Sequence, residues 1–268
     1  RDVLGSRGLG DVYKRQHEHH LTDKPFNRYY LHSVDGFVYM SEQVHSELRA
    51  YSDAPALFSP HPLFENFGER VERSEACVRL GLDPANRYVL FFGLIRDYKG
   101  LDLLLDAWAQ LRRAGRTEGR RLIVAGEFYT AKEPYLKQIA DNGLQEEVLL
   151  HDRFIPDDDV KYYFSAADFV VQPYKTATQS GVTQIAYQFC VPMVVTKVGG
   201  LAEIVPDGRV GYVCEPTPEG VAGAIERMYE GDTLQRFREN CVEERRRFSW
   251  EEMCSRITEL YGLVASGK

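Results

Sequence analysis

Short, continuous runs of apolar residues recur along the second two thirds of the chain, and segments with helical spacing separate them. The runs predict strands that are buried on both faces, joined by helical crossovers. The predicted strands are 88–92, 121–125, 148–150, 169–172, 193–196 and 211–214. The predicted helices are 101–111, 134–142, 157–165, 182–189, 218–230 and 250–264. This alternation indicates an α/β fold with a doubly wound parallel sheet.

An earlier segment, 17–60, carries its own strand–helix–strand pattern. Apolar runs at 36–40 and 56–58 predict two strands, and Ser41 is placed to cap the helix between them. Residues 59–62 read Ser-Pro-His-Pro, which interrupts regular structure, so we expect a linker to begin here. Residues 1–16, RDVLGSRGLGDVYKRQ, have no hydrophobic period and resemble a translated linker, so we leave them out of the fold.

Composition narrows the classes of function. The 268 residues carry 33 Lys and Arg against 40 Asp and Glu, and this net charge of −7 argues against a nucleic-acid partner. The apolar run 88–95 is far shorter than the ~20 residues of a membrane helix. The five cysteines are odd in number, widely spaced and without a CxxC pair. We therefore expect reduced thiols in a cytoplasmic protein, with neither a disulfide frame nor a zinc site.

Ligands of parallel α/β sheets bind beyond the carboxyl ends of the strands. The first loop at that edge, GLIRDYKG at 93–100, follows a strand and opens a helix. Gly93 lets the backbone approach a ligand, and Arg96 and Lys99 add two cations at a helix start. This combination suits a phosphate, because arginine offers paired donors and lysine a mobile charge. A solvated basic turn is the alternative.

Two later loops at the same edge are also polar. The loop 174–181, YKTATQSG, suits an anion or sugar hydroxyls, although an ordinary helix cap explains it equally well. Gln184 is placed to meet a ribose or sugar hydroxyl, or to face solvent. The loop 197–203 carries a glycine pair, and its Glu203 is placed either to bind sugar hydroxyls or to cap a short helix.

Taken together, these segments resemble a known family. GLIRDYKG, then LIVAGEF, then TQSGVTQIAYQFCVPMVVTKVGGLAEIVPDGRVGYV occur in the order and spacing of the C-terminal domain of retaining, family-4 glycosyltransferases. The resemblance covers about residues 60–265 and implies the GT-B fold, which is Rossmann-like, with the second domain only partly present. It also implies a division of the chain into 17–60, the end of the acceptor-side domain; 61–85, an interdomain linker; 86–249, the nucleotide-sugar donor domain; and 250–268, a helix that crosses back.

The resemblance also assigns roles to single residues. Lys99 matches the lysine that binds the donor diphosphate. The arginine that usually shares this task would fall at Leu94, and here the arginine is Arg96, two positions later. Thr176 and Gln184 occupy the positions of two glutamates, eight residues apart, that hold the sugar and the ribose. Gln184 can still bond a ribose through its neutral amide, and Thr176 keeps a hydrogen-bonding group but loses the charge. The other implied donor-binding residues are Arg153 and Phe154 at the base, Ser180 and Gly181 at the phosphates, and Gly93, Gly199, Gly200 and Glu203.

The activity that the resemblance implies is retaining transfer of a sugar from a nucleotide sugar, with UDP or GDP as the nucleotide. The expected acceptor is a glycan or a lipid-linked molecule in bacterial cell-surface polysaccharide synthesis. We expect no cofactor and no metal, since Arg96, Lys99 and helix-end amides would stabilise the diphosphate. We also expect the chain to be an incomplete piece of the enzyme. Two alternatives remain: a non-catalytic nucleotide-sugar binding module, and a GT-B-fold sugar-nucleotide epimerase.

Three charged clusters favour structural interpretations. The cluster HEHH at 17–20 lacks metal-ligand spacing, so a solvated loop is favoured over a metal site. The three aspartates at 157–159 fit the start of a helix. The three arginines at 245–247 fit a solvated helix face, with peripheral contact to an anionic membrane as the weaker option.

Overall fold

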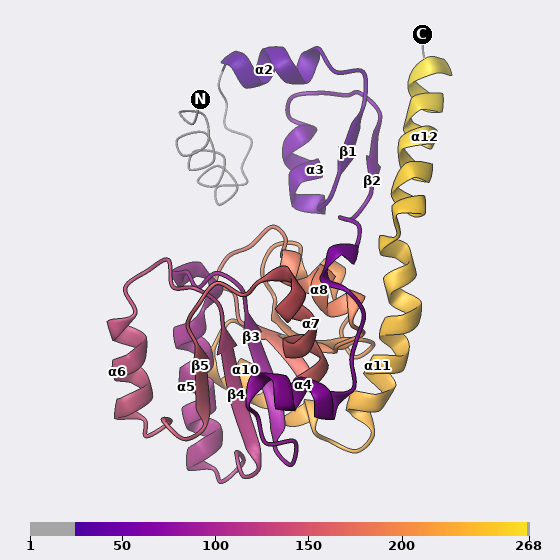
Figure 1. Ribbon diagram of the computed structural model, residues 1–268. Coiled ribbons are helices and arrows are strands. Elements are labelled where there is room, and N and C mark those ends of the chain that lie inside the picture. The colour runs from indigo at the N-terminus through magenta and orange to yellow at the C-terminus, as the bar shows by residue number, and fades with distance from the viewer. Residues whose placement is uncertain (1–24, 267–268) are drawn as a thin grey trace, which may run out of the picture.

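A computed structural model of the chain describes residues 25–266, which form two parallel sheets with helices around them (Figure 1). The strands are β1 Phe37–Tyr39, β2 Ala56–Phe58, β3 Arg87–Phe92, β4 Arg120–Ala125, β5 Val148–His151, β6 Phe169–Gln172, β7 Met193–Thr196 and β8 Gly211–Cys214. The α-helices are α2 Pro25–His32, α3 Glu42–Leu48, α4 Arg73–Leu80, α5 Leu101–Arg113, α6 Glu133–Asp141, α7 Asp157–Ala166, α8 Gly181–Gln188, α9 Leu201–Ile204, α10 Pro218–Met228, α11 Thr233–Glu244 and α12 Trp250–Ser266. The predictions for residues 1–16 and for the cluster at 17–20 lie outside the described residues.

The large sheet has the strand order β5-β4-β3-β6-β7-β8, and all its pairings are parallel. Leu90 in β3 pairs with Ile123 in β4 on one side and with Val170 in β6 on the other. The chain thus runs outward in one direction from β3 to β5 and in the other from β6 to β8. This confirms the predicted α/β fold with a parallel sheet.

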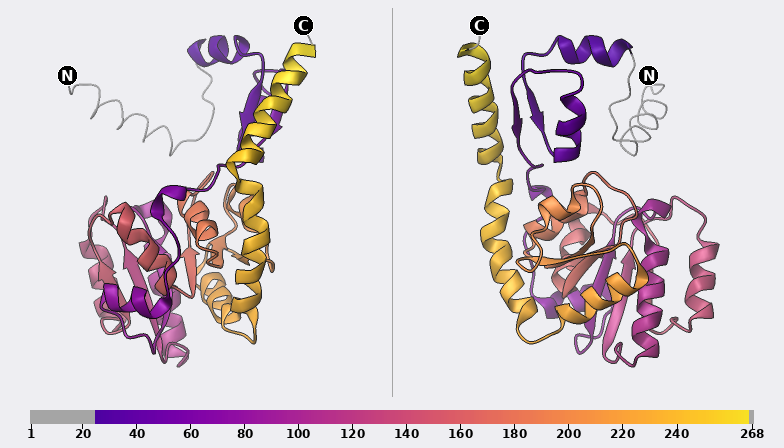
Figure 2. Two further views of the ribbon diagram at one scale, coloured as in Figure 1. Left: turned by 45° about the vertical axis from the view of Figure 1, so that its right-hand side comes forward. Right: turned by 180° about the vertical axis from the view of Figure 1, so that it is seen from behind.

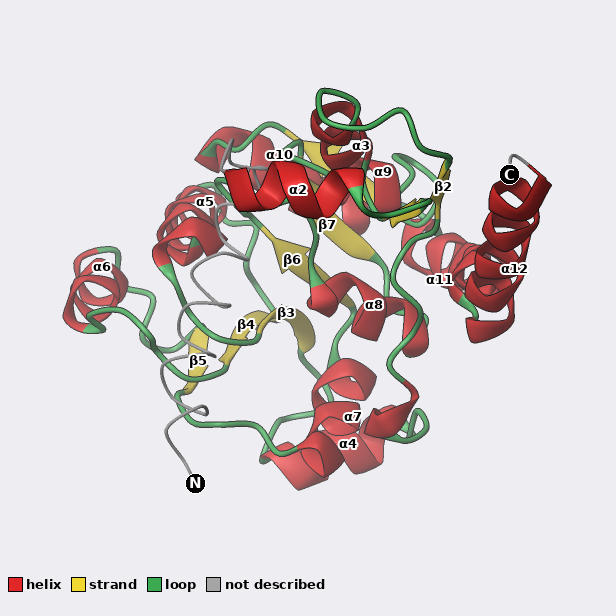
Figure 3. Cartoon of the chain, turned by 90° about the horizontal axis from the view of Figure 1, so that it is seen from above, coloured by secondary structure: helices red, strands yellow, loops and turns green. Residues whose placement is uncertain are grey.

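Helices cover both faces of this sheet (Figure 3). Val89 and Phe91 of β3 point into a core that they share with α5, α6 and α10. Leu90 and Phe92 point to the opposite side, into a core shared with α4, α7, α8 and α9. Because alternate residues of each strand enter different cores, the strands read as unbroken apolar runs in the sequence.

The small sheet pairs β1 with β2 in parallel, and α3 joins them. Ser41 Oγ accepts a hydrogen bond of 3.4 Å from the amide of Val44, which confirms the predicted cap. Helix α12 lies along this sheet (Figure 2). Leu260 and Val264 approach to within 3.0 Å of the place where a Cβ on Gly36 would stand. The last helix therefore packs against the strands that precede the linker.

Two helices of the large unit were not expected from the sequence. Helix α4 lies inside the predicted linker 61–85; its helical pattern is weak because only Ala76 and Cys77 are buried. In helix α11 only Thr233, Phe237 and Cys241 are buried, and most of its other residues are polar. Both helices show too little apolar periodicity for the pattern to reveal them. None of the helices between residues 25 and 266 has both the length and the apolar character needed to cross a bilayer.

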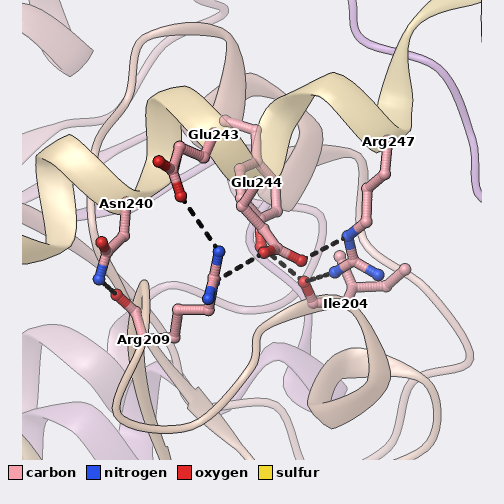
Figure 4. A network of polar contacts seen from close by, with 7 residues as sticks. Ile204, Arg209, Asn240, Glu243, Glu244 and Arg247 are labelled. Atoms are coloured by element: carbon pink, nitrogen blue, oxygen red, sulfur yellow. Dashed lines mark hydrogen bonds and ion pairs between the residues drawn. The ribbon is translucent and has the colours of Figure 1, made fainter.

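The prediction that residues 245–247 form a solvated face is wrong for two of the three arginines. Arg245 Nη1 donates to Gln188 O at 3.2 Å, and Arg247 Nη2 donates to Ile204 O at 2.7 Å. Arg247 Nε also forms an ion pair of 2.8 Å with Glu244 (Figure 4). Only Arg246 is exposed. The turn after α11 is held against α8 and α9 because buried carbonyl groups there need donors.

Candidate functional site

The neighbouring strands β3 and β6 mark the point where the winding of the sheet reverses. The connection from β3 leads to one side and that from β6 to the other, so the loops beyond their carboxyl ends separate. In doubly wound sheets such a switch point is where ligands bind. A cavity of about 290 Å³ lies there. Its wall includes Gly93, Arg96, Lys99, Tyr174, Ser180 and Gly181. The structure thus brings together predicted residues from two of the polar loops.

Lys99 is the most buried cation of this cavity, with 8% of its surface exposed. It ends a short 3-10 turn, Asp97–Lys99, that follows β3. Its Nζ lies 5.7 Å from the centre of the Tyr174 ring, and only about 3.1 Å from the place where a Cβ on Gly93 would stand. Burial, and to a lesser degree the charge of Arg96, lowers the pKa of Lys99 to about 8. Within residues 25–266 it forms no ion pair, so its charge is available to a ligand.

Arg96 lines the same cavity from the adjoining extended segment. Its guanidinium carbon lies 5.0 Å from the centre of the Tyr129 ring, which belongs to the loop after β4. The two loops are in close contact, since a Cβ on Gly126 would stand 2.1 Å from Gly93 O. The alternative of a solvated basic turn is wrong for Lys99, and Arg96 is only half-buried.

A second, smaller cavity of about 50 Å³ adjoins the first and shares Ser180 and Gly181 with it. Gln184 lines it and is 4% exposed, so the alternative that Gln184 faces solvent is wrong. Its Oε1 is buried and has no hydrogen-bond partner within the described residues. An unsatisfied amide oxygen in a cavity is a place for a hydroxyl donor of a ligand or for a water. The predicted ribose contact stays a prediction.

Helix α8 begins at Gly181, directly at the wall of both cavities. Ser180 occupies the N-cap position, but its hydroxyl makes no capping bond. Instead, Ser180 Oγ lies 3.1 Å from the Tyr174 hydroxyl. The alternative of an ordinary serine cap is therefore wrong. The first amides of α8 point toward the cavity end of the helix, where an anion is favoured.

A third cavity, of about 170 Å³, shares Gly93 and Leu94 with the first. Phe154 lines it and is 66% exposed. Arg153 is exposed and lines none of the three cavities; its charge, after burial, contributes to the lowered pKa of His151. The two predicted base-binding residues are therefore not equivalent, and Phe154 is the one beside a cavity.

The remaining predicted site residues line none of these three cavities. Thr176 is exposed and lines none of the three. Gly199 and Gly200 pack against the backbone of the loop after β6: a Cβ on Gly199 would stand 1.5 Å from Ala177 O. These glycines are explained by the close approach of two loops.

Glu203 contacts a segment that the sequence did not associate with it. Its Oε2 accepts a hydrogen bond of 3.2 Å from the amide of Glu42, in the first turn of α3. The alternative that Glu203 caps its own short helix is wrong, because α9 has no side-chain cap. Glu203 therefore links the large unit to the small sheet, next to the loop that carries the glycine pair.

Other residues at the cavities were missed in the sequence. His61 and Phe64, with ring centres 4.9 Å apart, line the second cavity, and Phe67 lines the first and third. All three come from the segment that the prolines marked only as a linker. The proline pattern shows where regular structure ends but gives no sign of what the segment covers.

No group of three or more His, Cys, Asp or Glu side chains that could hold a metal ion occurs between residues 25 and 266. The aspartates at 157–159 begin α7, as predicted. Asp157 accepts a hydrogen bond from Asn66, and Asp159 pairs with Arg79 at 3.1 Å.

The sequence matches proteins of known activity. The family described as "Glycosyl transferases group 1" matches residues 86–231. The chain is 30% identical over 206 residues to D-inositol 3-phosphate glycosyltransferase 1 of Catenulispora acidiphila, covering 73% of this chain and 49% of that protein. It is 27% identical to the D-inositol 3-phosphate glycosyltransferase of Corynebacterium diphtheriae, covering 84% of this chain and 55% of that one. The chain thus spans about half the length of the curated relatives it matches.

Solved structures show the same fold. Sucrose-phosphate synthase from Thermosynechococcus elongatus superposes with a TM-score of 0.75 at 20% identity, covering 96% of this chain and 66% of that one. Anabaena Alr3699/HepE, solved in complex with UDP and glucose, gives a TM-score of 0.67 at 20% identity, covering 91% and 70%. The fold is the GT-B fold of glycosyltransferases, and the matched family spans more than half of the chain, including the six strands of the large sheet. The chain belongs to the group 1 glycosyltransferases.

Proposed function

We propose that this chain binds a nucleoside diphosphate sugar at the switch point of its large sheet and takes part in transfer of the sugar, with retention, to a glycan or lipid-linked acceptor. The observation that carries the proposal is Lys99. A nearly buried ammonium that forms no ion pair with residues 25–266 is costly, and the cavity beside it is large enough for phosphate groups. A diphosphate supplies the missing negative charge.

The chemistry follows from where charge develops. When the bond between the sugar and the diphosphate breaks, negative charge builds on the diphosphate oxygen. Lys99, Arg96 and the first amides of α8 are held at the cavity wall before the reaction, so they stabilise that charge without rearranging. Stabilisation of the leaving group by fixed donors favours transfer over simple binding. In this scheme the donor set acts without a metal.

Two features support a particular ligand. The Anabaena neighbour was solved with UDP and with UDP-glucose, which favours UDP over GDP as the nucleotide. The third cavity, with the exposed Phe154 ring on its wall, lies beside the first and offers a flat surface to a base.

The acceptor is a separate question. The curated relatives are named for D-inositol 3-phosphate, so a phosphorylated polyol belongs among the acceptors to be tested beside lipid-linked sugars.

Proton NMR of UDP-glucose incubated with the chain tests the proposal. We expect release of UDP together with a sugar in the α configuration, on water or on an added acceptor. Lys99→Met should abolish the release, because the leaving group loses its buried cation. Lys137→Met is the matched control, since Lys137 is exposed on α6 and forms an ion pair with its helix neighbour Asp141.

The same spectra separate the alternatives. A new sugar nucleotide formed without release of UDP identifies an epimerase. Bound but unchanged UDP-glucose, with acceptors present, identifies a non-catalytic binding module. A sugar released first in the β configuration contradicts retention.

A further inference from the structure

Tyr129 is a large aromatic side chain that the protein leaves 55% exposed at the edge of the candidate site. It belongs to the loop after β4 and is not part of the core. Its ring lies 5.0 Å from the guanidinium carbon of Arg96, within the range of a cation–π contact. The contact is therefore the structural feature that accounts for an aromatic residue at this position.

The backbone fixes the place of this ring relative to Arg96. Ile95 N donates to Glu127 O at 2.8 Å, and Tyr129 N donates to Ile95 O at 2.9 Å. These bonds extend the pairing of β3 and β4 by one bridge, between Ile95 and Phe128. Gly126 permits the approach, because any Cβ there would collide with Gly93 O. Tyr129 and Arg96 thus stand on two loops that are held together.

Arg96 shares a cavity wall with Lys99. The two cations repel each other, and a long arginine side chain gains rotamer entropy by turning into solvent. A carboxylate would hold the guanidinium but would also neutralise it. An aromatic face holds a guanidinium without neutralising its charge.

We propose that Tyr129 is a positioning residue that keeps the Arg96 guanidinium stacked at the cavity wall, where it binds the diphosphate of the donor. The inference rests on the proposed function, since it takes the ligand of the cavity to be a nucleoside diphosphate. Tyr129 acts through Arg96 and has no chemical role of its own. Its ring is what matters, and its hydroxyl is dispensable.

Calorimetric titration with UDP, UMP and inorganic pyrophosphate tests this inference. Tyr129→Ala should lower the affinity for UDP and for pyrophosphate about three- to fivefold, which corresponds to the free energy of a surface cation–π contact. UMP, which lacks the second phosphate, should be affected less. Tyr129→Phe should bind all three like the wild type, because the ring face is kept. Tyr261→Ala removes another exposed tyrosine, on α12, and should change nothing.

A double-mutant cycle shows whether Tyr129 acts through Arg96. Adding Tyr129→Ala to Arg96→Ala should cost no further affinity, since the guanidinium is already absent. A merely structural effect of Tyr129 would add to that of Arg96 and would lower the melting temperature of the free protein. Because the ring is exposed, we expect the melting temperature of Tyr129→Ala to equal that of the wild type.

The outcomes are distinct. Wild-type affinity for UDP in Tyr129→Ala, or additive losses in the cycle, overturns the role of Tyr129 and leaves the proposed function intact. Absence of UDP and pyrophosphate binding in the wild type overturns both. An equal loss of affinity for UDP and for UMP in Tyr129→Ala also overturns the inference, because it places Tyr129 at the nucleoside.

Discussion

At the scale of single residues, the site is defined by charged and polar groups that the fold buries without satisfying them. Lys99 is almost fully covered yet has no ion pair within the described residues, and Gln184 keeps a buried amide oxygen without a partner. Both arrangements lower stability in the empty protein. Such groups are common at ligand sites, where the ligand supplies the missing partner.

The lowered pKa of Lys99 predicts opposite effects of pH on stability and on binding. With a pKa of about 8 in the folded chain against 10.5 in the unfolded one, the unfolded chain holds more protons between these values. The contribution of Lys99 to the free energy of unfolding therefore rises with pH over that window. Binding of UDP needs the protonated lysine, so its affinity should fall above about pH 8, by up to about tenfold per unit.

Titration calorimetry from about pH 7.5 to about pH 9.5 measures the second effect, and Lys99→Met is the control that should remove the pH dependence of affinity. An affinity for UDP that stays constant in the wild type across this range would show that Lys99 carries no charge-dependent contact.

Sequence reasoning found some of these residues and missed others for identifiable reasons. Arg96, Lys99, Ser180 and Gly181 were predicted because loops after parallel strands converge at one edge. His61 and Tyr129 were not predicted. The sequence around a proline-rich linker or around an aromatic residue in a loop does not show which residues that side chain contacts. The sequence also left Gln184 open between ligand and solvent, and only its burial excludes the solvent-facing alternative.

At the scale of elements, glycines decide how closely the loops of the site approach one another. Gly126 has φ +145°, and a Cβ there would stand 2.1 Å from Gly93 O. Gly100 has φ +69°, and a Cβ there would stand 2.0 Å from Pro173 O. The first contact joins the loops after β3 and β4, and the second joins those after β3 and β6.

Gly126→Ala should therefore lower the free energy of unfolding by about 2 kcal/mol or more, from backbone strain and a steric clash. Gly223→Ala makes the same substitution in α10, where a Cβ would have nothing within 4 Å. It should stabilise the protein by about 0.5–1 kcal/mol, since alanine is the better helix former. Urea denaturation of both variants measures the difference. Equal effects of the two substitutions would contradict the close approach of the loops.

The elements themselves were largely predictable. The strands of the large sheet are continuous apolar runs because both of their faces are buried, and such runs are visible without an alignment. Helices α4 and α11 were missed because they rest on the protein through few residues, so their sequences are polar almost throughout.

At the scale of the whole molecule, the segment after α11 connects the parts of the chain. Arg247 joins the turn to Ile204 in α9, and Glu244 pairs with both Arg247 and Arg209 (Figure 4). Helix α12 continues from this turn to the small sheet (Figure 2). A resemblance could suggest that the last helix crosses back, but it could not show which arginine holds the turn, since three follow one another in the sequence.

The structure predicts that substitutions of Arg246 and Arg247 differ in their effect on the stability of the protein. Arg247→Ala should lower the free energy of unfolding by about 1–2 kcal/mol, because the mutation removes a partner from Ile204 O and from Glu244. Arg246→Ala should change it by less than about 0.5 kcal/mol, since Arg246 is exposed. Thermal and urea unfolding check both values. A larger loss in Arg246→Ala than in Arg247→Ala would contradict the network.

The most direct test of the account is calorimetric titration of the chain with UDP, comparing the wild type with Lys99→Met and Lys137→Met. We expect saturable binding in the wild type and in Lys137→Met. In Lys99→Met, affinity should fall about tenfold or more, the size of a charge-assisted hydrogen bond to a buried cation. Equal affinity for UDP in Lys99→Met and in the wild type would contradict the assignment of this cavity as the diphosphate site.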